Sequence, residues 1–142
     1  MSNTHQVRTD FEIGEKAQIS KVIQQGDIET IAKVTGDYNP LHLDESFAKK
    51  TRFGGRIAHG ILGVGLISAV LGTQLPGPGG IYLSQSIDFL APVRVGDKIT
   101  AEVEVIGWKP ERKILSLDTR CFNQNQKNVL TGKSVLLVES IE

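Results

Sequence analysis

A carboxylate and an imidazole stand five residues apart in the segment GDYNPLH, which contains Asp37 and His42. Asn39 and Pro40 between them predict a turn with extended backbone around the asparagine, and such a turn can direct both side chains to one point. Histidine titrates near neutral pH and a carboxylate can orient or activate water, so the two are candidates for a general acid/base pair. The alternative is an Asp37 that only binds local N–H groups of the turn and a purely structural His42.

A second candidate cluster, Ala58-His59-Gly60, stands where a long apolar segment begins. If a helix starts here, its first N–H groups lack internal acceptors, and Gly60 lets a ligand oxygen approach them closely. This is the geometry of an oxyanion hole. The alternatives are a Gly60 that permits close helix packing and a His59 that caps the helix. Ser68 is a hydroxyl in an apolar segment, and it must bind the carbonyl four residues earlier or a partner outside the helix.

The elements that must position these residues can be predicted from the pattern of the chain. The apolar segment 58–71 predicts a helix that is too short to span a bilayer. Its apolar residues lie around the whole helical wheel, which is typical of a helix surrounded by protein. Upstream, Asp27 as N-cap and Gly36 as terminator predict a helix that ends just before the GDYNPLH segment. Asp44 predicts the cap of a brief helical turn after it.

Strands are predicted mainly in the second half of the chain, where apolar and polar residues alternate. The predicted strands are 17–23, 81–90, 98–105, 115–121 and 129–138. Helices followed by long antiparallel strands indicate an α+β domain in which a curved sheet wraps around a central helix. Open sheet edges would gain from pairing with a second copy, so we expect a homodimer or a higher homo-oligomer.

Composition narrows the class of protein further. The 142 residues include 16 basic and 16 acidic ones, and this zero net charge argues against nucleic acid or a membrane as partner. The length predicts a single domain over residues 1–142. One cysteine and three histidines leave little material for a metal site, so we expect none. Residues 1–15 show no secretory signal, and the expected location is cytoplasmic.

The motifs together resemble the MaoC-like family of (R)-specific enoyl-CoA hydratases. The resemblance rests on GDYNPLH, on the AHG that opens the apolar helix, and on Ser68 nine residues after His59. One position departs from the family motif, because Ile31 stands where an aromatic residue is expected. The likeness continues through 75–77, 81–86 and 92–97. It is greatest to the short bacterial type with one hot-dog unit, which supplies (R)-3-hydroxyacyl-CoA for polyhydroxyalkanoate synthesis.

The resemblance implies a hot-dog fold and the syn addition of water to a trans-2-enoyl-CoA. It implies that Asp37 and His42 hold and activate the water, that the Gly60 N–H stabilises the developing enolate, and that Ser68 supports the catalytic site. It places the acyl chain in an apolar tunnel near a dimer interface. No cofactor is expected, since hydration changes no oxidation state. The further candidates, for contact with the acyl-CoA substrate, are Asn39, His59 and Leu71.

Three other functions remain open at this point. A 3-hydroxyacyl-carrier-protein dehydratase would use the same residues in reverse. A hot-dog acyl-CoA thioesterase would direct water at the thioester carbonyl and would not need the Asp-x-Asn-Pro-x-His unit. A silent CoA-binding module would keep the fold without the acid/base pair. The residues that would hold the CoA phosphates are not identified by any motif, and Arg94, Lys109 and Arg112 are candidates only because they are cationic and near predicted loops.

Overall fold

The structure is a computed structural model, which describes residues 6–139. One five-stranded sheet and four helices make up this part of the chain. In chain order the elements are β1 (Lys16–Val22), α1 (Gln25–Thr35), α2 (Pro40–Leu43), α3 (Glu45–Ala48), α4 (Gly60–Thr73), β2 (Gly80–Phe89), β3 (Lys98–Lys109), β4 (Ile114–Phe122) and β5 (Asn128–Val138). The predicted α+β class and all five predicted strands are confirmed.

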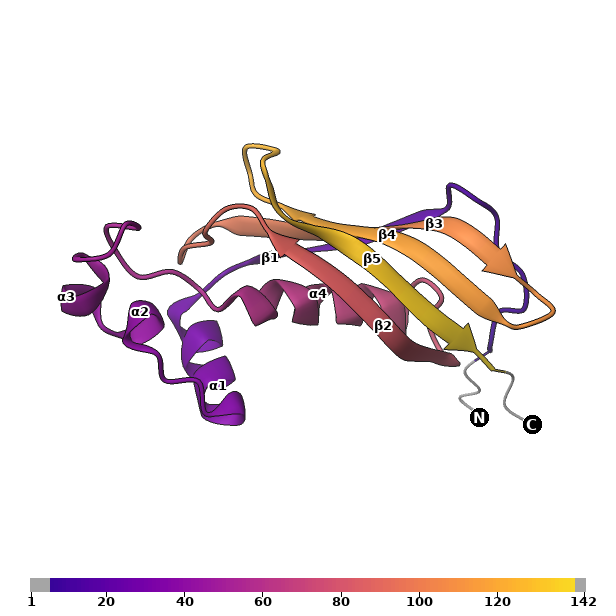
Figure 1. Ribbon diagram of the computed structural model, residues 1–142, viewed down its shortest axis with the longest axis horizontal. Coiled ribbons are helices and arrows are strands. Elements are labelled where there is room, and N and C mark those ends of the chain that lie inside the picture. Colours follow the sequence, from indigo (N-terminus) through magenta and orange to yellow (C-terminus); the bar gives the residue numbers. More distant parts are fainter. Residues whose placement is uncertain (1–5, 140–142) are drawn as a thin grey trace, which may run out of the picture.

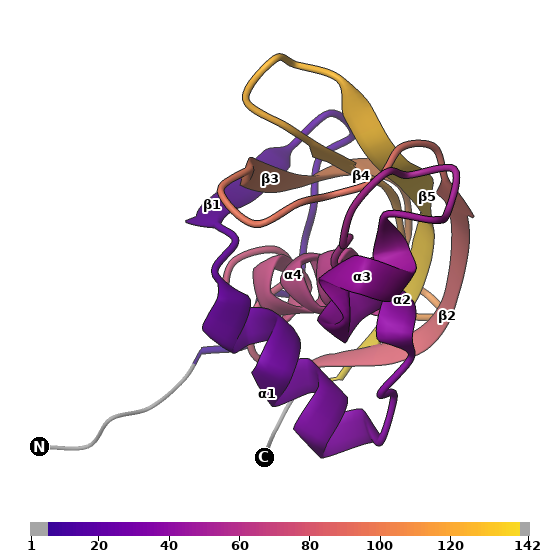
Figure 2. The same ribbon diagram turned by 90° about the vertical axis from the view of Figure 1, so that its left-hand side faces the viewer.

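The sheet curves around α4, as the end-on view in Figure 2 shows. Its strand order is β1-β3-β4-β5-β2, and every neighbouring pair is antiparallel. The three short N-terminal helices lie together beyond one end of α4 (Figure 1). Strands β1 and β2 are the two edges of the sheet, and β2 is the strand that directly follows α4.

The alternation within the central strands explains how the sheet presents one apolar face to α4. On β3, Ala101, Val103 and Val105 are completely buried, while Glu102 and Glu104 between them are only partly covered. This strand runs on to Lys109, four residues beyond the predicted strand. A register shift after Val105 interrupts the alternation of apolar and polar residues, but the pairing with β4 continues. The prediction ended the strand at 105 because it followed the alternation alone.

Helix α4 is covered on one face only in the single chain. Val70 and Leu71 are at most 2% exposed and belong to the core beneath the sheet, whereas Ile61 is 51% exposed. The prediction of a helix surrounded by protein is therefore wrong for the single chain, because the five strands curve around only part of its circumference. Ser68 is exposed as well, so its expected apolar surroundings are also corrected. No helix in residues 6–139 has both the length and the apolar character that crossing a membrane requires.

Helix α1 begins slightly earlier than predicted. Gln24 is its N-cap, and Asp27 lies three positions further, where its carboxylate accepts a hydrogen bond from the Gln24 N–H at 2.8 Å. This is a capping box, in which the acidic residue closes the first turn from inside the helix. At the other end Gly36 terminates α1 as predicted, with a left-handed φ of 80°. The predicted cap of α3 is confirmed, since Asp44 accepts the Phe47 N–H at 3.2 Å.

Candidate active site

The backbone turn after α1 places Asp37. Its N–H donates to the Thr35 hydroxyl at 3.1 Å, and one of its carboxylate oxygens accepts the Asn39 N–H at 3.2 Å. Asn39 has φ of −52° and ψ of 123° and caps α2 by accepting the Leu41 N–H at 3.1 Å. The predicted turn is confirmed, without regular extended backbone at Asn39, and Asp37 does bind a local N–H group as the alternative interpretation required. Because only one carboxylate oxygen takes part in that contact, the other stays available for chemistry.

His42 lies on α2, which begins at Pro40. Proline suits the first position of a helix, where its missing N–H has no acceptor to serve. The turn therefore passes directly into one helical turn, and this turn buries the imidazole to 8% exposure. His42 Nδ1 lies 2.7 Å from the Ile57 carbonyl oxygen. A carbonyl can only accept, so Nδ1 carries the proton, and Nε2 of the neutral ring keeps a lone pair that can take a proton from water.

His59 is the N-cap residue of α4, and its side chain makes no capping hydrogen bond. The side chain instead turns toward the turn after α1, where Nε2 donates to the Asp37 carbonyl oxygen at 3.0 Å. The ring is 3% exposed and lies against the His42 ring, with 3.9 Å between centroids and 31° between planes. His59 Nδ1 is buried without a hydrogen-bond partner among the described residues. His59 therefore ties the start of α4 to the backbone of the candidate acid.

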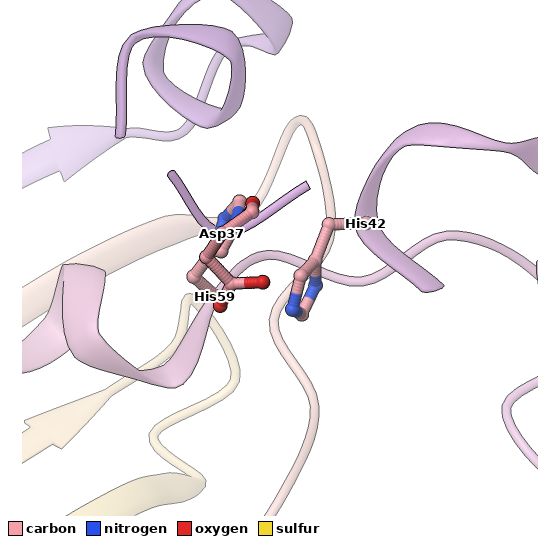
Figure 3. A group of neighbouring side chains, drawn as sticks. All are labelled: Asp37, His42 and His59. Atoms are coloured by element: carbon pink, nitrogen blue, oxygen red, sulfur yellow. The ribbon is translucent and has the colours of Figure 1, made fainter. Parts of the chain in front are cut away.

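Three chain segments meet at this point. Asp37, His42 and His59 each place one ligating atom within 4.8 Å of the others. Figure 3 shows them gathered, with a carboxylate oxygen of Asp37 pointing toward the His42 ring. Two of the three histidines in the chain thus lie in one site. The number of histidines alone could not predict this. These residue types could hold a metal ion or transfer protons, and the two imidazole planes are tilted by 31° to each other. That the site takes no metal stays a prediction.

An open cavity of about 720 Å³ lies beside the two imidazoles. Its walls are mostly apolar, with side chains from the loop before α4, from the first turns of α4 and from the connection between β2 and β3; examples are Ile57, Leu62, Leu66 and Val93. Gly60, at the first turn of α4, also lines it. A Cβ at Gly60 would lie 2.7 Å from the Phe89 ring, so the close approach of this helix end to β2 depends on glycine.

Four of the predicted site residues are not among those that line this cavity, namely Asp37, Asn39, Ser68 and Leu71. Leu71 does not line it, because Leu71 faces the sheet, and the apolar wall on α4 is formed by Leu62 and Leu66 instead. Contact of Leu71 with the substrate stays a prediction. Ser68 lies on the exposed face of α4 and is not part of the cavity wall either. Its supporting role stays a prediction, as do the roles of Asp37, His42 and Gly60. Asn39 is exposed and serves as a helix cap.

The sequence carries no signal for several groups that shape the site. The Ile57 carbonyl that orients His42 is a main-chain atom, and no side-chain type marks it. Arg52 and Phe53 line the cavity from a charged, glycine-containing loop, which has the composition of any solvated loop. Cys121 is near the cavity wall, where its thiol lies 3.5 Å from the Gly63 carbonyl oxygen. Burial raises the pKa of this thiol to about 12, so it stays protonated at neutral pH and is no nucleophile.

A curved antiparallel sheet around one helix, with an apolar cavity and a candidate acid/base pair near the start of that helix, is the arrangement of a hot-dog enzyme. The family model described as "MaoC like domain" matches residues 6–122, and the chain belongs to this family.

Several known proteins are similar to this chain over most of its length. An (R)-specific enoyl-CoA hydratase of Rhodospirillum rubrum is 46% identical, over 91% of this chain and 89% of its own length. A 3-hydroxybutyryl-CoA dehydratase of Methylorubrum extorquens is 47% identical, over 94% of this chain and 84% of its own. Among solved structures, the (R)-hydratase from Aeromonas caviae involved in PHA biosynthesis superposes with a TM-score of 0.87 and 44% identity, covering 91% of this chain and 98% of that one.

Proposed function

We propose that this protein is an (R)-specific enoyl-CoA hydratase, which adds water to a trans-2-enoyl-CoA and forms (3R)-3-hydroxyacyl-CoA reversibly. One observation carries the proposal: a carboxylate oxygen of Asp37 lies within 4.8 Å of a ring nitrogen of His42, and the His42 ring lines an apolar cavity. The 46% identity to a hydratase of that name supports it. The dehydratase name of another relative describes the removal of water, which is the reverse direction of such a reaction.

The chemistry follows from the two side chains. Hydration forms a C–O bond at C3 and a C–H bond at C2, while the double bond between them is lost. Asp37 and His42 hold the water, and the proton that its oxygen releases on attacking C3 passes to one of them. A proton then returns from the pair to C2. We propose that both side chains act on one face of the substrate, as the family resemblance implies, so that oxygen and hydrogen are added to the same face and the addition is syn.

Negative charge develops on the thioester oxygen during the attack. The Gly60 N–H at the start of α4 is our candidate donor to that oxygen, because the first N–H groups of a helix lack internal acceptors and lie at the positive end of its dipole. Fixed dipoles in an apolar site stabilise such charge without reorganising. The reaction changes no oxidation state, and we therefore propose that it needs no cofactor.

We further propose that two copies pair along β2. This edge strand exposes Leu83 and Phe89, and the uncovered face of α4 exposes Ile61 beside the cavity. A second copy would cover these apolar side chains and remove the open strand edge, both of which a lone chain leaves in water. We also propose a role in the supply of polyhydroxyalkanoate synthesis, because the A. caviae structure is that of an (R)-hydratase involved in PHA biosynthesis. The cytoplasm is the location that we propose from the composition of residues 1–15.

A spectroscopic assay tests the activity. Addition of the protein to crotonyl-CoA is expected to lower the absorbance of the conjugated enoyl thioester. Asp37→Asn keeps the size of the side chain and removes its charge, so it is expected to slow this decay by about 10² or more. Undiminished activity of Asp37→Asn would contradict the assignment.

The substrate carrier is tested separately. A carrier-protein dehydratase would use the same site, so crotonyl-CoA and the crotonyl thioester of an acyl carrier protein must be compared with the same enzyme. We expect the higher kcat/KM for crotonyl-CoA. A clear preference for the carrier-protein thioester would instead identify the dehydratase of the alternative interpretation.

A further inference from the structure

The cavity beside the two imidazoles has an uneven distribution of charge. Its wall is apolar except for His42, His59 and Arg52, and Arg52 is the one lysine or arginine that lines it. No aspartate or glutamate belongs to this wall. Such a cavity suits a molecule with an uncharged, mainly apolar body and an anionic end, provided that the anionic end reaches the arginine.

Arg52 is free to receive such a group. It is exposed, and in residues 6–139 no carboxylate lies within ion-pairing distance of its side chain. Its guanidinium carbon lies 5.9 Å from the centre of the Phe53 ring, which also lines the cavity. Lys49 and Lys50, which follow α3 directly, are exposed and equally without an ion pair in this part of the structure. Three uncompensated positive charges therefore stand within four residues.

The loop that carries Arg52 is held in place by the other arginines nearby. The Arg94 guanidinium donates to the Phe53 and Arg56 carbonyl oxygens, at 2.5 and 3.3 Å. Arg56 in turn pairs with Glu45 of α3 at 3.0 Å. Arg94 and Arg56 are thus engaged in fixing the loop, which leaves Arg52 as the arginine that can serve a ligand. This also removes Arg94 from the candidates for phosphate binding.

The two remaining candidates lie far from the cavity. Lys109 ends β3, and Arg112 lies in the hairpin that joins β3 to β4. This hairpin and the start of α4 are at opposite ends of the molecule, as Figure 1 shows. A thioester that reaches His42 cannot place its phosphates on that hairpin without crossing the length of the sheet.

We propose that Arg52, supported by Lys49 and Lys50, binds the phosphate groups of a CoA thioester whose acyl end lies in the cavity. The proposal rests on the hydratase function proposed above. Arginine recognises phosphate through paired N–H donors, and two nearby lysines add to the attraction that the four-residue segment exerts on a polyanion. A chain without net charge can in this way still place a local group of positive charges where the substrate is anionic.

The test uses two substrates that differ in the nucleotide part of CoA, which carries all of its phosphates. Crotonyl-CoA carries the nucleotide part, and crotonyl-pantetheine ends before it. Arg52→Ala is expected to lower kcat/KM for crotonyl-CoA about fivefold more than for crotonyl-pantetheine, mainly through KM. Arg52→Glu is expected to enlarge this ratio. Arg112→Ala removes an equally exposed arginine at the far end of the sheet and is the matched control, for which we expect no change with either substrate.

Other outcomes would overturn the proposal. An equal loss with both substrates would show that Arg52 supports the loop and not the phosphates, and no loss with crotonyl-CoA would remove Arg52 from the site. If the unmodified protein hydrates neither thioester, the hydratase function fails, and calorimetric titration with free CoA and with pantetheine still decides the question. Arg52→Ala must then weaken binding of CoA, and equal CoA affinity of both proteins would refute the phosphate site.

Discussion

Two hydrogen bonds to main-chain carbonyls determine how the site imidazoles can act. The Ile57 carbonyl holds the proton on His42 Nδ1, and the Asp37 carbonyl holds the proton on His59 Nε2. The lone pairs are therefore on the opposite nitrogens of each ring. On His42 this is Nε2, the atom that the proposed mechanism requires as proton acceptor. Ring orientation thus depends on backbone atoms that precede α4 and follow α1.

The substitution His42→Asn tests proton transfer at Nε2 separately from the hydrogen bond at Nδ1. An asparagine amide can place a donor where His42 Nδ1 is, near the Ile57 carbonyl, but it has no group at the position of Nε2. We expect hydration of crotonyl-CoA to slow by about 10² or more, while the thermal unfolding midpoint stays close to that of the unmodified protein. Near-normal rates in this variant would show that His42 is structural, which is the alternative stated from the sequence.

At the residue scale the sequence already contained the acid/base pair but not its surroundings. Asp37 and His42 could be recognised because the proline between them restricts the backbone, and this restriction depends only on neighbouring residues. The approach of His59 to His42 could not be predicted, since it depends on how α4 packs against the sheet. For the same reason the sequence of an all-apolar helix does not show that Leu62 and Leu66 face the cavity while Leu71 faces the sheet.

Helix α1 controls where the turn with Asp37 begins. Its C-cap residue Gly36 has a φ of 80°, a left-handed conformation that costs other residues free energy. Open space surrounds the position that a Cβ of Gly36 would occupy, so any cost of a side chain there comes from the backbone alone. The same helix contains Gly26, which has helical backbone and equally open surroundings. The two glycines therefore form a matched pair for testing the turn.

Gly36→Ala is expected to lower the free energy of unfolding by about 1 kcal/mol, because alanine must adopt the left-handed conformation. Gly26→Ala is expected to raise it by up to about 1 kcal/mol, because alanine favours the helix. Chemical denaturation of both variants at one protein concentration measures these changes. If the free energy of unfolding changes in the same direction in both variants, the left-handed conformation at Gly36 does not determine the effect of alanine there.

The strands and helices themselves follow from local pattern to within a few residues. The ends that differed were set by particular contacts, such as the Asp27 carboxylate that caps α1 from inside and the register shift that lets β3 continue after Val105. Periodicity could not reveal either one, because the first is one side-chain hydrogen bond and the second is an irregularity in strand pairing.

For the whole molecule, the positions of the exposed apolar residues indicate where a second copy would bind. Strand β2 is an open edge, and its apolar side chains continue onto the uncovered face of α4. The proposed pairing along β2 would cover both. It would also bring a second chain close to Phe89 and Ile61, which line the cavity. Assembly and activity are then expected to change together.

Leu83→Lys tests this coupling. Leu83 is 52% exposed on β2, and a lysine there would meet its own copy across the proposed interface. We expect a shift from dimer to monomer in sedimentation velocity and a lower kcat/KM for crotonyl-CoA. Ile13→Lys, at a comparably exposed position before β1, is the control and is expected to change neither. An unmodified protein that sediments as a monomer would exclude the pairing.

The configuration at C3 of the hydration product tests the proposed site most directly. The unmodified protein should convert crotonyl-CoA to (3R)-3-hydroxybutyryl-CoA, and Asp37→Asn should form this product at least about a hundredfold more slowly. Chiral separation of the hydrolysed product measures both. Formation of the (3S) product would contradict the assignment of Asp37 and His42 as the pair that adds water to the enoyl thioester.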